Sequence, residues 1–204
     1  MDFGVNESNL NKKSKTIFEK LSSMDYKERH IEMGKLYPVV LFKHGRIRID
    51  FIAQNTIKHA SIRNLVGPEI YINKVENFEF LMENKRKINI KYKNKKYGIF
   101  CPEPVAFLLH KCVTFIDRDE KEKQAKDLYY AYFILRYAPE EIFKDIKKYN
   151  KNIRLKVFEN IKKYFNFKTS NACMVERECG NDYYIEDLRG DIFERFNKFA
   201  KILK

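Results

Sequence analysis

Polar and apolar side chains alternate along Arg46-Ile47-Arg48-Ile49-Asp50-Phe51-Ile52. Such alternation predicts a β-strand with Ile47, Ile49 and Phe51 on one face and Asp50, Arg46 and Arg48 on the other. The apolar run 36–42 predicts a second strand, and Lys43-His44-Gly45 predicts the turn between the two. The sequence therefore predicts a β-hairpin that presents Asp50 beside two arginines.

Further strands are expected around this hairpin. Residues 2–5 read as a strand, and Ser8 is a candidate N-cap for a helix that carries apolar residues on one face and ends near 25–30. Residues 70–72 predict a short strand. Residues 87–100 predict a second hairpin, with its turn at 93–96.

The character of the chain changes after Cys101. Pro102 and Pro104 mark a helix start, and an apolar stripe follows through Val105, Leu108, Leu109, Cys112 and Phe115. Later stripes predict a helix through Leu128, one that starts at Pro139, and two more near the C-terminus. Strands first and helices last predict the α+β class. We expect a small mixed sheet with flanking helices over residues 1–101, followed by a C-terminal helical bundle over residues 102–204.

Composition narrows the class of partner. The formal net charge of +13 favours an anionic partner such as nucleotide or nucleic acid, although the richness in Lys, Asn, Ile and Tyr is also what an AT-rich genome produces. No apolar run approaches the roughly 20 residues of a spanning helix, so no membrane association is expected. Four cysteines are too few for a disulfide scaffold, and a cytoplasmic protein with reduced thiols is expected.

Two carboxylates are candidates for chemistry. Asp50 by itself is weak evidence for a functional site, because most aspartates on exposed strand faces are simply solvated. Asp2 lies in another strand-like fragment, and if the two strands pair, both carboxylates can converge on one divalent cation. Mg²⁺ prefers oxygen ligands and nucleotide phosphates, so this pair is a candidate Mg²⁺ site.

At this point the chain resembles the nucleotidyltransferase superfamily of the DNA polymerase beta type. More narrowly, it is similar to bacterial stand-alone nucleotidyltransferase-like proteins, including those related to abortive-infection toxins. The resemblance rests on the Asp-Phe strand, on Arg-Ile-Asp-Phe-Ile at 48–52, on a Pro-Glu…His-Lys helix at 102–111, and on Lys126-Asp127-Leu128. It covers roughly residues 1–138.

The resemblance implies roles for particular residues. Asp2 and Asp50 would be the catalytic, metal-binding carboxylates, with Mg²⁺ on the triphosphate of an NTP and Asp50 acting on the acceptor hydroxyl. Lys111 and Lys126 would neutralise phosphate charge. Asp127 would orient a lysine or the acceptor, and Arg48 would join them in nucleotide binding. RNA, a protein or a small molecule could be the acceptor.

One departure from the family keeps a second function open. The family begins with a Gly-Ser turn and a first aspartate that would precede Met1, so the resemblance implies an N-terminally incomplete domain. The alternatives are a non-catalytic nucleotide- or nucleic-acid-binding module, a toxin–antitoxin component, or a plain basic RNA-binding or scaffold protein. Two basic clusters, 85–96 and 144–168, suit a nucleic-acid backbone, and solvated surface is the competing interpretation.

Overall fold

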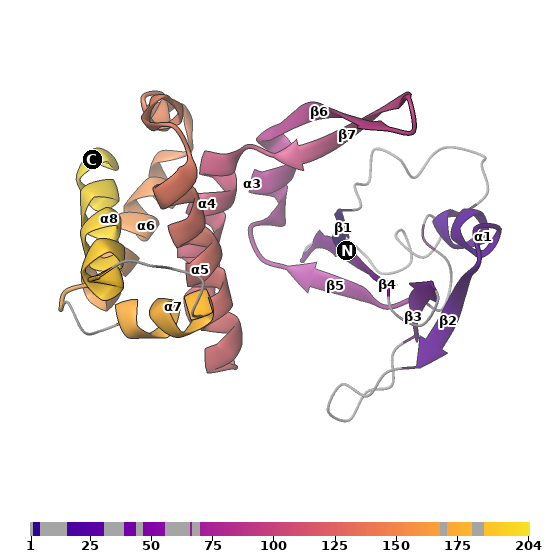
Figure 1. Ribbon diagram of the computed structural model, residues 1–204, viewed down its shortest axis with the longest axis horizontal. Coiled ribbons are helices and arrows are strands. Elements are labelled where there is room, and N and C mark those ends of the chain that lie inside the picture. The colour runs from indigo at the N-terminus through magenta and orange to yellow at the C-terminus, as the bar shows by residue number, and fades with distance from the viewer. Residues whose placement is uncertain are drawn as a thin grey trace. The chain divides into compact units, whose positions relative to one another are not determined.

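The computed structural model describes residues 2–4, 16–30, 39–43, 47–55, 66, 70–167, 171–180 and 186–204. The chain divides into two compact units, Met1–Met82 and Glu83–Lys204. This boundary precedes the second hairpin, which therefore belongs to the C-terminal unit, whereas the sequence suggested a boundary after residue 101. The elements of each unit are labelled in Figure 1.

A five-stranded mixed sheet forms the centre of the N-terminal unit. Its strands are β1 (Asp2–Gly4), β2 (Tyr26–His30), β3 (Val39–Lys43), β4 (Ile47–Gln54) and β5 (Ile72–Val75). The order is β1-β4-β3-β2, and β5 also pairs with β4. Strand β4 is parallel to β1 and β5 and antiparallel to β3. Helices α1 (Ile17–Ser22) and α3 (Phe78–Glu83) complete the described elements of this unit.

Strand β4 has the expected two faces. Ile49 and Phe51 are buried, with Ala53, in a core that also includes Val66, Ile70 and Ile72. Asp50, between two buried residues, is only partly buried. The predicted hairpin is confirmed as the antiparallel β3–β4 pair, in which Leu41 is the partner of Ile49. The alternation along β4 therefore presents its polar residues on the face away from this core.

The first helix differs from its prediction at both ends. It begins at Ile17, after a capping box in which Thr16 and Glu19 hydrogen-bond each other's backbone N–H; the expected cap, Ser8, lies outside the described residues. The expected helix end at 25–30 is wrong. Asp25 has a positive φ of 64°, and the chain then forms β2, which pairs with β3.

The C-terminal unit joins a β-ribbon to a helical bundle. The ribbon consists of β6 (Lys85–Tyr92) and β7 (Lys95–Pro102). The α-helices are α4 (Pro104–Thr114), α5 (Lys121–Tyr137), α6 (Lys151–Tyr164), α7 (Ala172–Cys179) and α8 (Leu188–Ile202), and three short 3-10 turns are Phe115–Asp117, Glu140–Phe143 and Ile146–Lys148. The α+β fold class, with its mixed sheet and C-terminal helices, is confirmed.

The apolar stripes of the sequence meet in the core of this bundle. Leu108 and Leu109 of α4 and Leu128 of α5 are fully buried. The rings of Phe165 and Phe196 stack at 4.1 Å and so join the end of α6 to α8. Pro139 precedes the 3-10 turn Glu140–Phe143 and not the α-helix expected to start there, and α7 was not foreseen.

Candidate active site

Strands β1 and β4 bring the two candidate aspartates to partnered positions of the backbone. Asp2 is the register partner of Asp50 in the parallel β1–β4 pair, and Phe3 is the partner of Phe51. Because side chains alternate along both strands, register partners share a face of the sheet. Asp2 and Asp50 thus occupy one face, opposite the buried Phe51.

The absence of a side chain at Gly4 lets a helix approach β1. A Cβ at Gly4 would lie 2.6 Å from Cζ of Phe78 and 3.2 Å from Sδ of Met82, so α3 packs where a side chain would stand. Arg48 lies on β4 in register with Phe42 of β3, two residues before Asp50. Three of the expected residues therefore lie on adjacent strands of one sheet.

A second group of expected residues meets in the C-terminal unit. The buried carboxylate of Asp127 on α5 accepts hydrogen bonds from Nζ of Lys111 at 2.5 Å and from Nε of Arg118 at 2.9 Å. Lys111 comes from α4, and Arg118 follows the 3-10 turn Phe115–Asp117. Gln124 donates to the carbonyl of Arg118 at 2.7 Å, which holds that loop against α5.

Aromatic rings surround the lysine of this cluster. Nζ of Lys111 lies 5.3 Å from the ring centroid of Phe107 and 5.9 Å from that of Tyr130, distances at which a cation interacts with a ring. Tyr130 is 38% exposed, whereas Tyr132 is fully buried and its hydroxyl donates to Asp191 at 2.6 Å. The tyrosine run is thus divided between core and surface.

Not every expected residue joins this cluster. Lys126 is exposed, because consecutive helical positions are about 100° apart and Asp127 takes the inward one. His110 is buried. The thiol of Cys112, on the same helix, is also buried, and this burial raises its pKa, with a further rise from the charge of Asp127. Arg118 was missed from the sequence, where it was one of several charges in the segment 117–123. Arg118 lies beyond the end of α4 at Thr114, so its spacing from Lys111 follows no helical period and gave no local signal.

Comparison with known protein families matches residues 5–153 to a family described as nucleotidyltransferase. The chain belongs to this nucleotidyltransferase family. The matched range contains Asp50, Lys111, Arg118 and Asp127. No curated protein and no solved structure matches the chain. Membership supports nucleotidyl transfer as the general function and an NTP as substrate, and enzymes of this kind generally use divalent metals.

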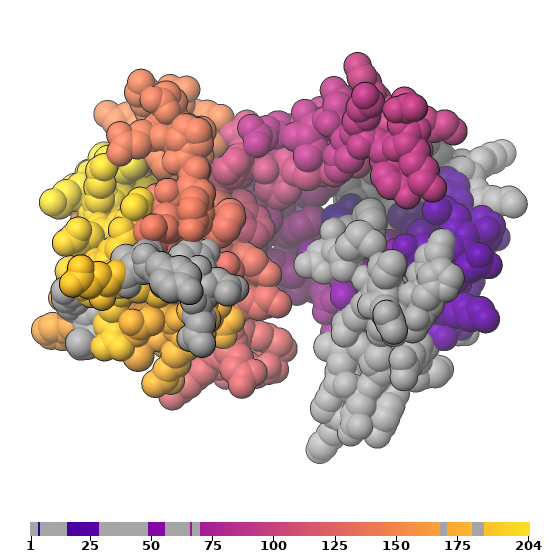
Figure 2. Space-filling view, in the orientation of Figure 1, coloured from indigo at the N-terminus to yellow at the C-terminus, as the bar shows by residue number. Residues whose placement is uncertain are grey.

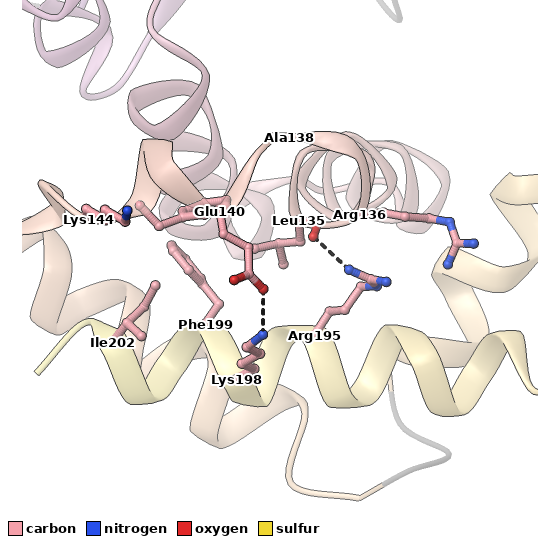
Figure 3. A pocket seen from close by; sticks show the side chains of 10 residues that line it. Leu135, Arg136, Ala138, Glu140, Lys144, Arg195, Lys198, Phe199 and Ile202 are labelled. Carbon is pink, nitrogen blue, oxygen red and sulfur yellow. Dashed lines mark hydrogen bonds and ion pairs between the residues drawn. The ribbon is translucent and has the colours of Figure 1, made fainter.

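A cavity of about 420 Å³ lies in the C-terminal unit of this nucleotidyltransferase. Its walls include Phe143. Phe199 and Ile202, which also line it, are labelled in Figure 3. Two contacts join groups of its lining: Lys198 pairs with Glu140 at 2.9 Å, and Arg195 donates to the carbonyl of Leu135 at 3.0 Å.

The described residues lack two features that a metal centre or a membrane protein would show. In that part of the chain, no three His, Cys, Asp or Glu side chains gather in a way that could hold a metal ion. Asp2 and Asp50 offer a pair of carboxylates, and carboxylate oxygens suit a hard divalent cation that takes its other ligands from phosphate and water. Among the same residues, no helix is long and apolar enough to cross a membrane.

Proposed function

We propose that this protein transfers a nucleoside monophosphate from an NTP to a hydroxyl acceptor, with Asp2 and Asp50 as the ligands of Mg²⁺. The observation that carries the proposal is the register of β1 and β4, in which these two aspartates are partners. In the reaction, a bond forms between the acceptor oxygen and the α-phosphorus. The bond to the bridging oxygen breaks, and pyrophosphate leaves.

Asp50 is the residue to which we assign the proton transfer. Its carboxylate orients the acceptor hydroxyl and takes its proton as attack begins, which is the work of a general base. Asp2 and Asp50 together hold Mg²⁺, which supplies charge neutralisation on the triphosphate. Asp50 is partly buried, and its two neighbours along the strand, Ile49 and Phe51, are both buried in the core. The strand is therefore held firmly at Asp50, which supports this role.

Basic residues of each unit are assigned to nucleotide binding in this proposal. We assign Lys111, Lys126 and Arg48 to nucleotide binding, with Arg118 added from the structure. Asp127 acts through Lys111 and Arg118 by holding both cations in place, and the two hydrogen bonds it accepts support that positioning role. The location we propose is the cytoplasm, where the four free cysteines would stay reduced.

The test uses NTPs labelled at the α-phosphate or at the γ-phosphate. Transfer predicts that the α-label moves to an acceptor while the γ-label is released in pyrophosphate, and that EDTA stops both. We expect Asp50→Asn to lower the rate at least ~100-fold, because a preorganised charge contact is lost. The matched control is Glu28→Gln, which removes an exposed carboxylate from β2 of the same sheet and should leave the rate unchanged.

Two results would contradict the proposal. Full transfer by Asp50→Asn would remove the assigned base. Mg²⁺-dependent NTP binding without movement of the α-label to any offered RNA, protein or small hydroxyl compound would favour the non-catalytic nucleotide-binding module instead.

A further inference from the structure

The two-stranded ribbon of the C-terminal unit has two different faces. Strands β6 and β7 pair antiparallel over their whole length and form a sheet of their own. The turn residues Lys93 and Asn94 have φ values of 44° and 62°, as in a two-residue type I′ hairpin. Since register partners share a face, residues 85, 87, 89 and 91 lie on one side with their partners on β7.

This side, here called the lysine face, carries four of the ribbon's seven basic residues. It consists of the register pairs Lys85–Pro102, Lys87–Phe100, Asn89–Gly98 and Lys91–Lys96. The opposite face carries mainly apolar residues, including Ile88, Ile99, Ile90 and Tyr97. All four lysines of the lysine face are exposed. The ribbon to which they belong forms part of the magenta surface in Figure 2.

The ribbon itself contains no acidic residue to offset its positive charge. Residues 85–102 contain seven basic residues and no acidic one. Among the described residues, no ion pair joins a carboxylate to a lysine of the lysine face. Lys91 and Lys96 stand directly opposite each other, and like charges in such a pair destabilise a sheet. A bound polyanion would relieve this repulsion.

An aromatic ring lies among these lysines. Phe100 is 65% exposed, and Nζ of Lys85 lies 5.5 Å from its ring centroid. The stem of Lys87 crosses the ribbon next to it, where a Cβ at Gly98 would lie 2.5 Å from Cε of Lys87. Exposed rings between cations are how proteins bind unpaired bases and their phosphates together.

We propose that the lysine face binds a single-stranded segment of RNA. Phe100 needs an unstacked base, which disfavours a duplex. Lysine supplies point charges for phosphates, without the fork of arginine that reads base edges, so the binding is independent of sequence. The choice of RNA rests on the proposed function, in which RNA is a candidate acceptor. Asn89, between Lys87 and Lys91, offers a donor and an acceptor for a 2′-hydroxyl.

The experiment measures binding of a fluorescent single-stranded RNA by anisotropy, in EDTA and over a range of salt concentrations. Replacing Lys85, Lys87, Lys91 and Lys96 with Gln should weaken binding at least tenfold near physiological salt. Each phosphate contact contributes about 0.7 to the slope of log K against log salt concentration. Loss of four contacts should therefore lower the magnitude of that slope by about 3. Replacing the same four with Arg should restore both. Phe100→Leu should weaken binding about fivefold or more and leave the slope unchanged.

The matched control removes the same charge from α6. Lys151, Lys156, Lys162 and Lys163 are exposed there, and their replacement with Gln should change the affinity less than threefold. Equal weakening by both quadruple variants would overturn the proposal, as would tighter binding of duplex RNA or single-stranded DNA, or equal competition by polyglutamate. Asp50→Asn should bind RNA like the parent chain, so failure of the ribbon and failure of the transfer chemistry are separable.

Discussion

Asp2 of β1 and Asp50 of β4 are register partners in a parallel pair of strands. Residues 48 positions apart in the sequence thereby occupy adjacent places on one face of the sheet. Two carboxylates in that relationship can serve one cation jointly, which distinguishes them from two independent acidic residues.

The first prediction concerns that joint action. Asp2→Asn and Asp50→Asn should each reduce nucleotidyl transfer strongly, and the double variant should be no more than about threefold worse than the worse single one. Residues that act as a unit are non-additive in this way. Single-turnover rates of the four proteins measure the coupling. If the two losses multiply, the aspartates act separately and the shared site is wrong.

The second prediction concerns the stability of the Asp127 cluster. Asp127→Asn leaves Lys111 and Arg118 facing each other without their anion, and we expect unfolding free energy to fall by about 3 kcal/mol, as for other buried pairs that lose one partner. Urea denaturation measures the change. The control is Glu120→Gln, which breaks the exposed Lys123–Glu120 pair of the same region at 2.8 Å and should cost less than about 0.5 kcal/mol.

The third prediction concerns acid stability. Glu103 accepts hydrogen bonds of 2.6 Å from Lys148 and from Tyr149. These bonds hold the pKa of Glu103 below its ordinary value of 4.5, and the bond from Lys148 has the larger effect. A lowered folded-state pKa means that this stabilisation is complete above pH 4.5 and is lost as pH falls through the folded-state value. Glu103→Gln should therefore flatten the decline in unfolding free energy below pH 4.5. An unchanged acid profile would show that other groups cause the decline.

The fourth prediction concerns the end of α4. The buried Nδ2 of Asn160 donates to the carbonyl of Cys112 at 2.9 Å. This carbonyl belongs to the last turn of α4, where the carbonyl groups lack partners within the helix. Asn160→Ala should cost about 2 kcal/mol, and Asn160→Asp more, because a buried carboxylate would face carbonyl oxygens. Thermal unfolding measures both. The control is Asn152→Asp at an exposed position of α6, the helix that also carries Asn160, and it should change stability little. An equal loss of stability at both positions would remove the special role of Asn160.

Patterns within single elements were the part that the sequence predicted well. The alternation around Asp50 predicted β4, because the period of two follows from strand geometry alone. The stripe through Leu108 and Leu109 predicted α4 for the corresponding reason at a period of 3.6. Strand β2 was missed because Tyr26-Lys27-Glu28-Arg29-His30 is mostly polar, as suits the end of a sheet, where charges discourage further pairing.

The candidate site was predicted only in part. The aspartates and Lys111 with Asp127 were named from motifs, whereas Arg118 was one charge among many in its segment. Nothing local marks Arg118, since its significance comes from the buried carboxylate of Asp127, nine residues away. Lys126 carries the same charge as Lys111 but faces solvent, because its helical position turns it outward.

The sequence alone thus determined the α+β class, the polar face of β4 and the candidate carboxylates, since each depends on periodicity or residue type within one segment. Three further facts came from the three-dimensional structure: Asp2 is the register partner of Asp50, Asp127 is shared by Lys111 and Arg118, and four lysines lie on one face of the ribbon. These facts depend on strand register and helix packing, in which distant segments meet, and pairing register is set by how whole elements bury their apolar faces.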